Sequence, residues 1–135
     1  MDIKCQRKSI YSKGNSIIRK FNQCSENVKD RLFQSFCSNF YSCSLWSSFS
    51  MSTINSLKVA YNNVYRYLHN VKPPNITGYF VSKNIDSFKV VLRKASYSLF
   101  NRCFNSDNIL VSTIFNSAYF MFSSKLMCNW VDLSF

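Results

Sequence analysis

The near absence of glycine and proline constrains the fold of this chain more than any other feature. Its 135 residues include two glycines and two prolines. Tight turns between strands depend on these residues, so a fold of many short strands lacks its turn signals. The chain is long enough to bury a core, and its 47% hydrophobic content is not that of a disordered tail. The sequence therefore predicts an all-α fold of long helices.

The segment LKVAYNNVYRYLHNV, residues 57–71, shows the helical period most clearly. Apolar side chains recur every three or four positions and form one stripe: Ile54, Leu57, Tyr61, Val64 and Leu68. An adjoining face is polar and basic: Lys58, Asn62, Tyr65, Arg66 and His69. We expect the first face in the core and the second at the surface. Ser52 or Thr53 is the expected N-cap, and Pro73 and Pro74 stop this helix.

Two helices are predicted before it. The first spans residues 6–22, with Ile10, Gly14, Ile17, Ile18 and Phe21 inward and Lys8, Ser12, Asn15 and Arg19 opposite. Because glycine costs about 1 kcal/mol inside a helix, Gly14 indicates close helix packing. The second begins after Ser25 and ends near Trp46. Its expected buried stripe is Val28, Leu32, Phe36 and Phe40, widened by Phe33, Cys37 and Tyr41.

The second half of the chain follows the two prolines. GYFVS, residues 78–82, has the composition of a short strand but no evident partner strand. A fourth helix is expected from Asn84 or Asp86 to the NSDN break at residues 105–108, and a fifth follows. In the fourth, the expected inward side chains are Phe88, Val91, Leu92, Ala95, Leu99 and Cys103, with Lys89, Arg93 and Tyr97 on the outer flank. Residues 123–135 remain unassigned.

The six cysteines do not suggest a metal or disulfide framework. None forms a C-x-x-C pair, and His69 is the only histidine. No signal peptide is evident, so we expect an intracellular chain, in the cytoplasm or nucleus, with reduced and buried thiols. No run approaches the roughly 20 apolar residues that span a membrane. We expect no metal and no cofactor.

The net charge of +11 is spread along the chain. Such a field favours polyanions, either nucleic acid or an anionic membrane surface. The alternative is biased codon usage, because Lys, Asn, Ile, Phe and Tyr are all AT-rich choices.

No enzyme motif is present, neither a phosphate-binding loop nor paired carboxylates. His69 has no carboxylate nearby in sequence, so a surface or stacking histidine is expected. Two groups combine cations with a tyrosine, as suits a phosphate backbone with a stacked base: Lys58, Tyr65, Arg66 and Lys89, Arg93, Tyr97. The alternative is that these tyrosines lie at the edge of the core.

Three segments resemble the part of non-LTR retrotransposon reverse transcriptases that follows the palm: residues 2–37, 57–71 and 87–108. The most specific matches are Y-x-x-G-N-x-x-x-R-K-F (Tyr11, Gly14, Asn15, Arg19, Lys20, Phe21) and V-A-Y-N-N at residues 59–63. Val71-Lys72-Pro73-Pro74 departs from the Leu-Pro sequence expected there. The paired aspartates of the polymerase, usually in an A-D-D motif, are absent.

The resemblance implies a three-helix thumb-like bundle over residues 1–72 and a C-terminal helical extension over residues 73–135. It also implies a non-catalytic fragment that binds the template–primer backbone, as RNA–DNA hybrid or duplex DNA, with a palm supplied by a larger chain. The expected nucleic-acid contacts are Lys8, Lys13, Arg19, Lys20, Lys58, Tyr65, Arg66, Lys89, Arg93 and Tyr97. The main alternative is an inactive fragment that only self-associates. A basic membrane binder is disfavoured, because mutual packing consumes the apolar stripes.

Overall fold

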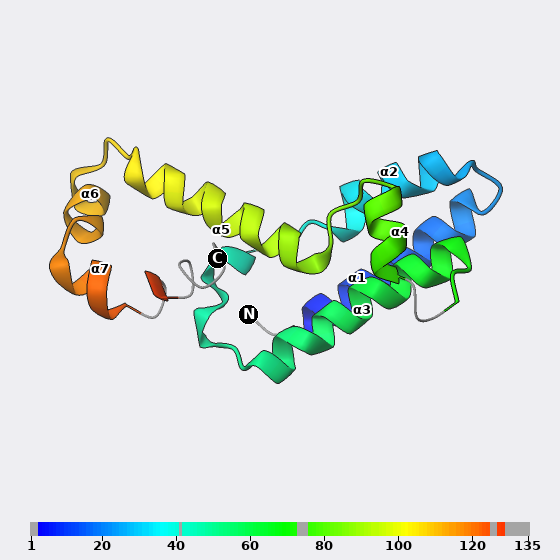
Figure 1. Cartoon of the computed structure of the whole chain (residues 1–135), viewed down its shortest axis with the longest axis horizontal. Helices are drawn as coiled ribbons and strands as arrows, with labels where there is room; N and C mark the ends of the chain where they lie inside the picture. The colour runs from blue at the N-terminus through cyan, green and yellow to red at the C-terminus, as the bar shows by residue number, and fades with distance from the viewer. Residues whose placement is uncertain (1–2, 41, 73–75, 125–126, 129–135) are drawn as a thin grey trace. The chain divides into compact units, whose positions relative to one another are not determined.

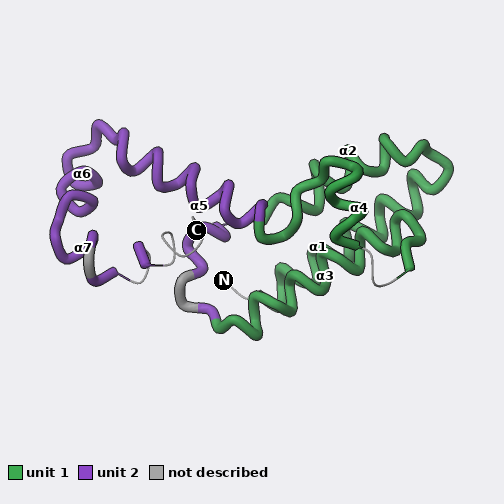
Figure 2. Tube along the Cα trace, in the orientation of Figure 1, with its two compact units in different colours: residues 1–41, 50–89 green, residues 42–49, 90–135 purple. Residues whose placement is uncertain are grey.

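The computed structural model describes residues 3–40, 42–72, 76–124 and 127–128. All elements assigned there are helical, which confirms the all-α prediction (Figure 1). They are α1 (Ile3–Phe21), α2 (Glu26–Cys37), the 3₁₀ helix η1 (Cys43–Ser48), α3 (Met51–His69), α4 (Ile76–Ser82), α5 (Phe88–Phe104), α6 (Ile109–Phe115) and α7 (Ala118–Ser123). Figure 2 shows two compact units: unit 1, residues 1–41 and 50–89, and unit 2, residues 42–49 and 90–135.

Unit 1 is built around the contact between α1 and α3. These two helices lie side by side and run in the same direction, whereas α2 runs in the opposite direction and contacts both (Figure 1). Gly14 is buried at the contact, where a Cβ atom would overlap the side chain of Val64. The prediction of close helix packing at Gly14 is therefore confirmed. Ile10 and Ile17 are buried as expected, whereas Phe21 at the end of α1 is exposed.

The predicted core stripe of α3 is confirmed from residue 57 onward, since Leu57, Tyr61, Val64 and Leu68 are buried, whereas Ile54 is only partly buried. Tyr65 was expected on the polar face but is fully buried as well. The reason is that its ring lies between Phe33 of α2 and Phe80 of α4, at centroid distances of 5.1 and 4.9 Å. The core of unit 1 is thus wider than one helical stripe.

The predicted buried face of α2 is confirmed in part. Phe33, Cys37 and Phe40 are buried as expected, whereas Val28 and Phe36 are 44% and 53% exposed and Asp30 is buried as well. The polar residue Asp30 lies on the buried side of the helix, where Tyr65 and His69 of α3 contact its carboxylate. The helix also ends at Cys37, well before Trp46, and the 3₁₀ helix η1 follows.

The helix boundaries after α2 also differ from those predicted. The N-cap of α3 is Ser50, whose hydroxyl accepts from the Thr53 N–H at 3.3 Å. The helix ends at His69, and the C-cap residue Asn70 adopts a left-handed conformation (φ 53°), so the helix stops before the prolines. Asparagine tolerates this conformation better than most residues.

Residues 76–82 form α4 and not a strand, because Ile76 and Phe80, four positions apart, are buried on one side of a helix. The Tyr61 hydroxyl donates to the Asp86 carbonyl at 2.8 Å, and Phe88 contacts Phe40 at a centroid distance of 5.3 Å. These contacts extend unit 1 to residue 89, beyond the boundary that we expected at residue 72.

Unit 2 contains most of α5 and the short helices η1, α6 and α7, and it has a small core. Phe115 and Met127 are buried, and partly buried side chains surround them: Leu99, Phe100, Cys103 and Phe120. The predicted break at residues 105–108 is confirmed, and Asn108 caps α6 by accepting from the Leu110 and Val111 N–H groups. Most of residues 123–135 lie outside the described ranges. Among the described helices, none is both long and apolar enough to cross a membrane.

Candidate nucleic-acid interface

A basic groove runs along the junction of α1 and α3 in unit 1. Its volume is about 810 Å³. Seven lining residues come from α1 and two from α3: Arg7, Lys8, Tyr11, Ser12, Asn15, Ser16 and Arg19, then Ser56 and Val59. Three of these side chains are cationic and none is acidic. The groove therefore presents an uncompensated positive charge, as an anionic ligand requires.

Two of the predicted contacts, Lys8 and Arg19, lie in this groove. The sequence placed them on one face of the helix with Ser12 and Asn15, and all four line the groove. Arg7 also lines it, although the sequence analysis did not select it. Its position four residues before Tyr11 was the available signal, because residues i and i+4 are neighbours on a helix.

A chain of polar contacts connects the groove with Arg66. The Asn63 side-chain amide donates to the Tyr11 hydroxyl at 3.5 Å, and Arg66 Nη1 donates to Asn63 Oδ1 at 3.3 Å. The Nε atom of Arg66 is buried and makes no hydrogen bond within the described residues. Arg66 thus stands beside the groove without lining it, while Asn63 orients Tyr11 in its wall.

The other predicted contacts do not lie in this groove. Lys13 faces α2, where its charge opposes the effect of burial, which raises the pKa of the Cys37 thiol to about 11. Lys20 is exposed near the end of α1, and Lys58 is half-buried on α3. Lys13, Lys20 and Lys58 are therefore not members of the groove.

Tyr65 must be removed from the predicted contacts, because it is fully buried. By contrast, Lys89, Arg93 and Tyr97 are exposed at four-residue intervals on α5, as expected. They form a second basic face, separate in sequence from the groove.

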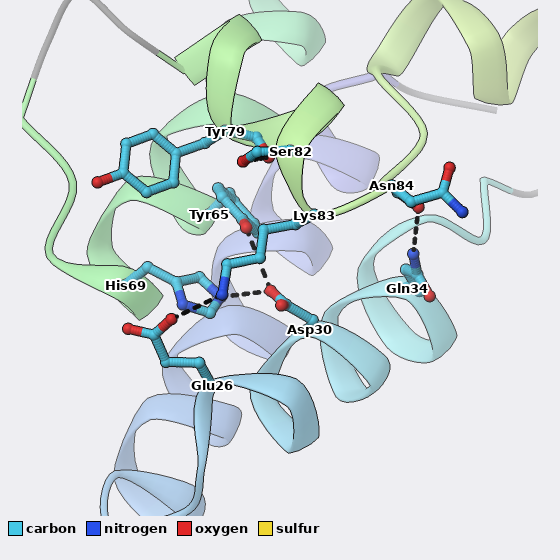
Figure 3. Close-up of polar contacts among 9 residues, drawn as sticks. All are labelled: Glu26, Asp30, Gln34, Tyr65, His69, Tyr79, Ser82, Lys83 and Asn84. Atoms are coloured by element: carbon cyan, nitrogen blue, oxygen red, sulfur yellow. Dashed lines mark hydrogen bonds and ion pairs between the residues drawn. The ribbon is translucent and has the colours of Figure 1, made fainter.

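A buried polar cluster joins α2 to α3 (Figure 3). The Tyr65 hydroxyl donates to Asp30 Oδ1 at 3.1 Å. His69 Nε2 lies 2.8 Å from the same oxygen, within ion-pair distance, although the ring nitrogen makes no aligned hydrogen bond. The His69 side chain is 3% exposed, and its ring contacts that of Tyr65 at a centroid distance of 4.5 Å with an interplanar angle of 39°. His69 was expected at the surface or in a stack; it is instead buried, with its ring tilted against Tyr65.

The electrostatics of this cluster follow from burial. Burial lowers the pKa of His69, and Asp30 opposes this shift. Burial also raises the pKa of Tyr65, with Asp30 acting in the same direction. Lys83, just after α4, bonds Glu26 at 2.8 Å, and this contact lowers the pKa of Glu26 (Figure 3). The sequence analysis missed the carboxylate partner of His69 because Asp30 lies 39 positions away.

Only some of the cysteine side chains are buried. All six cysteines are free; Cys37 and Cys43 are buried, whereas Cys5 and Cys128 are exposed. The expectation of buried thiols therefore holds for only part of the set. In the described part of the chain, no three His, Cys, Asp or Glu side chains gather in a way that could hold a metal ion.

A second cavity, of about 450 Å³, lies between α2 and the end of α4. Arg31 and Lys83 line it, but so does Asp30, and Lys83 is already paired with Glu26. Its charge is therefore mixed, which leaves the α1–α3 groove as the better anion site.

No protein-family model, curated protein or solved structure matches this chain.

Proposed function

We propose that this chain is a non-catalytic helical module that binds the phosphate backbone of nucleic acid, like the thumb of a non-LTR retrotransposon reverse transcriptase. The observation that supports the proposal most directly is the α1–α3 groove, with three cations and no acid. Backbone contacts by Arg and Lys supply most of the affinity in non-specific nucleic-acid binding. The absence of the paired aspartates in the sequence is consistent with a role in binding.

The length of the groove suits a nucleic-acid strand. Arg7 and Arg19 are twelve residues apart in one helix, which at 1.5 Å per residue separates them by about 18 Å along the axis. This length corresponds to about five base pairs along the axis of a duplex, at a rise of 3.4 Å per base pair. The exposed face of Lys89 and Arg93 on α5 adds a further candidate contact.

The salt dependence of binding tests the proposal. A labelled RNA–DNA hybrid is titrated with the purified chain by fluorescence anisotropy at several salt concentrations. Each phosphate contact contributes about 0.9 to the slope of log K against log salt in duplex DNA. The triple variant Arg7→Ala, Lys8→Ala, Arg19→Ala should therefore reduce the slope by about 2.7 if all three contact phosphates.

The matched control removes three exposed cations outside the groove: Arg31→Ala, Lys72→Ala and Arg102→Ala. Both triple variants lose three positive charges, so their comparison distinguishes binding by the groove residues from attraction by the net charge of the chain. A much smaller change is expected in the control. Equal losses in both variants would mean that net charge alone attracts the nucleic acid. A wild-type chain that is helical by circular dichroism but binds nothing would refute the function itself.

The second basic face is tested separately. The double variant Lys89→Ala, Arg93→Ala should reduce the slope by about 1.8 if both side chains contact phosphates. An unchanged slope would remove α5 from the interface and leave the groove as the candidate.

A second candidate function is self-association without nucleic-acid binding. The exposed apolar side chains of α2 and α6 favour it, in particular Phe36 and Leu110. Analytical ultracentrifugation over a range of chain concentrations distinguishes the two functions. Self-association that is unaffected by added nucleic acid, together with no binding in the titration, would support this candidate.

A further inference from the structure

The second cavity of unit 1, between α2 and the end of α4, is lined by polar side chains. Its volume of about 450 Å³ lies within the range of about 300–1,000 Å³ that is usual for small-molecule sites. Four lining residues share one face of α2 and three lie at the end of α4: Asn27, Asp30, Arg31 and Gln34, then Ser82, Lys83 and Asn84. The α2–α4 cavity therefore suits a small polar ligand.

Asp30 is the one acidic residue among the described lining of this cavity, and it is 8% exposed. Its Oδ1 atom accepts from the Tyr65 hydroxyl and lies 2.8 Å from His69 Nε2. Its Oδ2 atom has no hydrogen-bond partner within the described residues. Because both oxygens of a carboxylate accept hydrogen bonds, Asp30 keeps one acceptor for a ligand in the cavity.

The charge of Asp30 has no cationic partner at neutral pH within the described residues. The Tyr65 hydroxyl is neutral, and burial lowers the pKa of His69 below 6.5, so its ring is neutral there as well. The ammonium of Lys83 is bound to Glu26 Oε2 at 2.8 Å and forms no ion pair with Asp30 (Figure 3). A buried carboxylate without a cation is costly, so a positively charged group in the cavity would stabilise it.

Arg31 supplies the opposite charge beside Asp30. Its guanidinium is exposed and makes no hydrogen bond or ion pair within the described residues. A guanidinium binds a carboxylate through two parallel hydrogen bonds. The carboxamides of Asn27 and Asn84 are likewise without a partner in the described ranges, and each can both donate and accept. The cavity thus combines one acceptor for a cation, one donor for an anion and neutral amides.

An α-amino acid carries an ammonium and a carboxylate on one carbon atom at neutral pH. We propose that the α2–α4 cavity binds a free α-amino acid, with its ammonium on Asp30 and its carboxylate on Arg31. These two residues are neighbours in one helix, which matches the short separation of the two charges in the ligand. The site lies outside the α1–α3 groove and does not depend on the proposed nucleic-acid binding.

The test begins with the full chain and the common L-amino acids. Thermal unfolding is measured at pH 7.5 with each amino acid at about 10 mM, and at least one should raise the midpoint, because a ligand that binds only the folded chain stabilises it. Calorimetric titration then gives the dissociation constant of the best ligand. Its decarboxylated and deaminated analogues each keep one of the two charges. Each should bind at least about tenfold more weakly than the amino acid.

Three variants locate the site. Asp30→Asn keeps an oxygen that accepts from Tyr65 but removes the charge, and it should weaken binding by about ten- to hundredfold. Arg31→Gln removes an exposed cation and should weaken binding by about two- to fivefold. Arg102→Gln removes an exposed arginine of unit 2 as the matched control and should leave the affinity unchanged. Circular dichroism verifies the helical fold of each variant.

The outcomes are distinct from those of the nucleic-acid titration. Absence of any stabilising amino acid would overturn the proposal and leave the backbone-binding function standing. Binding that Asp30→Asn and Arg31→Gln both retain in full would overturn the assignment to this cavity. A decarboxylated analogue that binds as tightly as the amino acid would overturn the role of Arg31. If Asp30→Asn does not fold, Arg31→Gln and the two analogues still decide the question.

Discussion

Unit 1 and unit 2 use similar apolar residues but bury them to different extents. Among the residues that the structure describes, the largest fully buried side chains all belong to unit 1, for example Phe33, Tyr61 and Tyr65. In unit 2, Ile109 and Leu110 remain 80% and 73% exposed. The packing of the helices differs between the units. In unit 1 the 19-residue helices α1 and α3 contact each other along several turns. Unit 2 contains most of the 17-residue helix α5, but its other α-helices, α6 and α7, have only 7 and 6 residues and present about two turns each.

The largest expected effect comes from deleting one aromatic ring in each unit. Phe33→Ala removes a side chain that contacts Tyr61 and Tyr65 at centroid distances of 4.8 and 5.1 Å, and it should lower the free energy of unfolding by about 3–5 kcal/mol. Phe115→Ala should cost less, because partly buried neighbours surround it. Chemical denaturation followed by circular dichroism measures both, and an equal cost would mean that the two cores are equally well packed.

A smaller effect is expected at Gly14, with Gly78 as its matched control. Gly14→Ala introduces a methyl group where Val64 already lies, and overpacking of this kind costs about 1–3 kcal/mol. Gly78→Ala adds the same methyl group within α4, where nothing outside the neighbouring residues and the backbone of the helix lies within 4 Å. It should stabilise the chain by about 0.5–1 kcal/mol through helix propensity. Thermal unfolding of the two variants should thus show shifts of opposite sign.

The buried histidine makes the stability of unit 1 depend on pH. Burial lowers the pKa of His69 below its ordinary value of 6.5, so the unfolded chain binds this proton more readily than the folded chain. The contribution of neutral His69 to the free energy of unfolding is therefore complete above about pH 6.5 and is lost as the pH falls further. Denaturation midpoints at pH 7.5, 6.5 and 5.5 should decrease in that order. This range lies above the ordinary value of 4.5 for Glu26, whose lowered pKa acts at lower pH.

The variant His69→Gln is the control for this pH dependence, and its midpoint should change less over the same range. A wild-type midpoint that rises as the pH falls would contradict the prediction. It would mean that attraction to Asp30, 2.8 Å away, outweighs the effect of burial.

The smallest effect on stability is expected at the exposed apolar residues of unit 2. Leu110→Ser changes a side chain that is largely in solvent and should alter the free energy of unfolding by less than about 0.5 kcal/mol. Self-association, measured by analytical ultracentrifugation, should decrease if this surface holds copies of the chain together. A large loss of stability would show that Leu110 belongs to a core.

The local features of unit 1 were readable from the sequence. The helical period predicted the core stripe of α3, and a glycine within an apolar stripe predicted the close contact of α1 with a neighbour. The groove face of α1 was also readable, because Lys8, Ser12, Asn15 and Arg19 share one side of the helix. The sequence did not predict that Arg7 lines the groove, nor that Ser56 and Val59 of α3 form its other side, since neither follows from the pattern of α1 alone.

Periodicity predicted only part of the buried face of α2, because it placed Val28 and Phe36 inward together with Phe33 and Cys37 and did not predict Asp30. The side with Asp30 is buried, where the Tyr65 hydroxyl donates to the carboxylate and His69 lies within ion-pair distance. Tyr65 is buried instead of exposed because its ring packs between Phe33 and Phe80. The spacing of apolar residues along one helix shows that an apolar stripe exists, because such a stripe depends only on the helical period. The choice between stripes depends on partners dozens of residues away, which come together only in the folded chain.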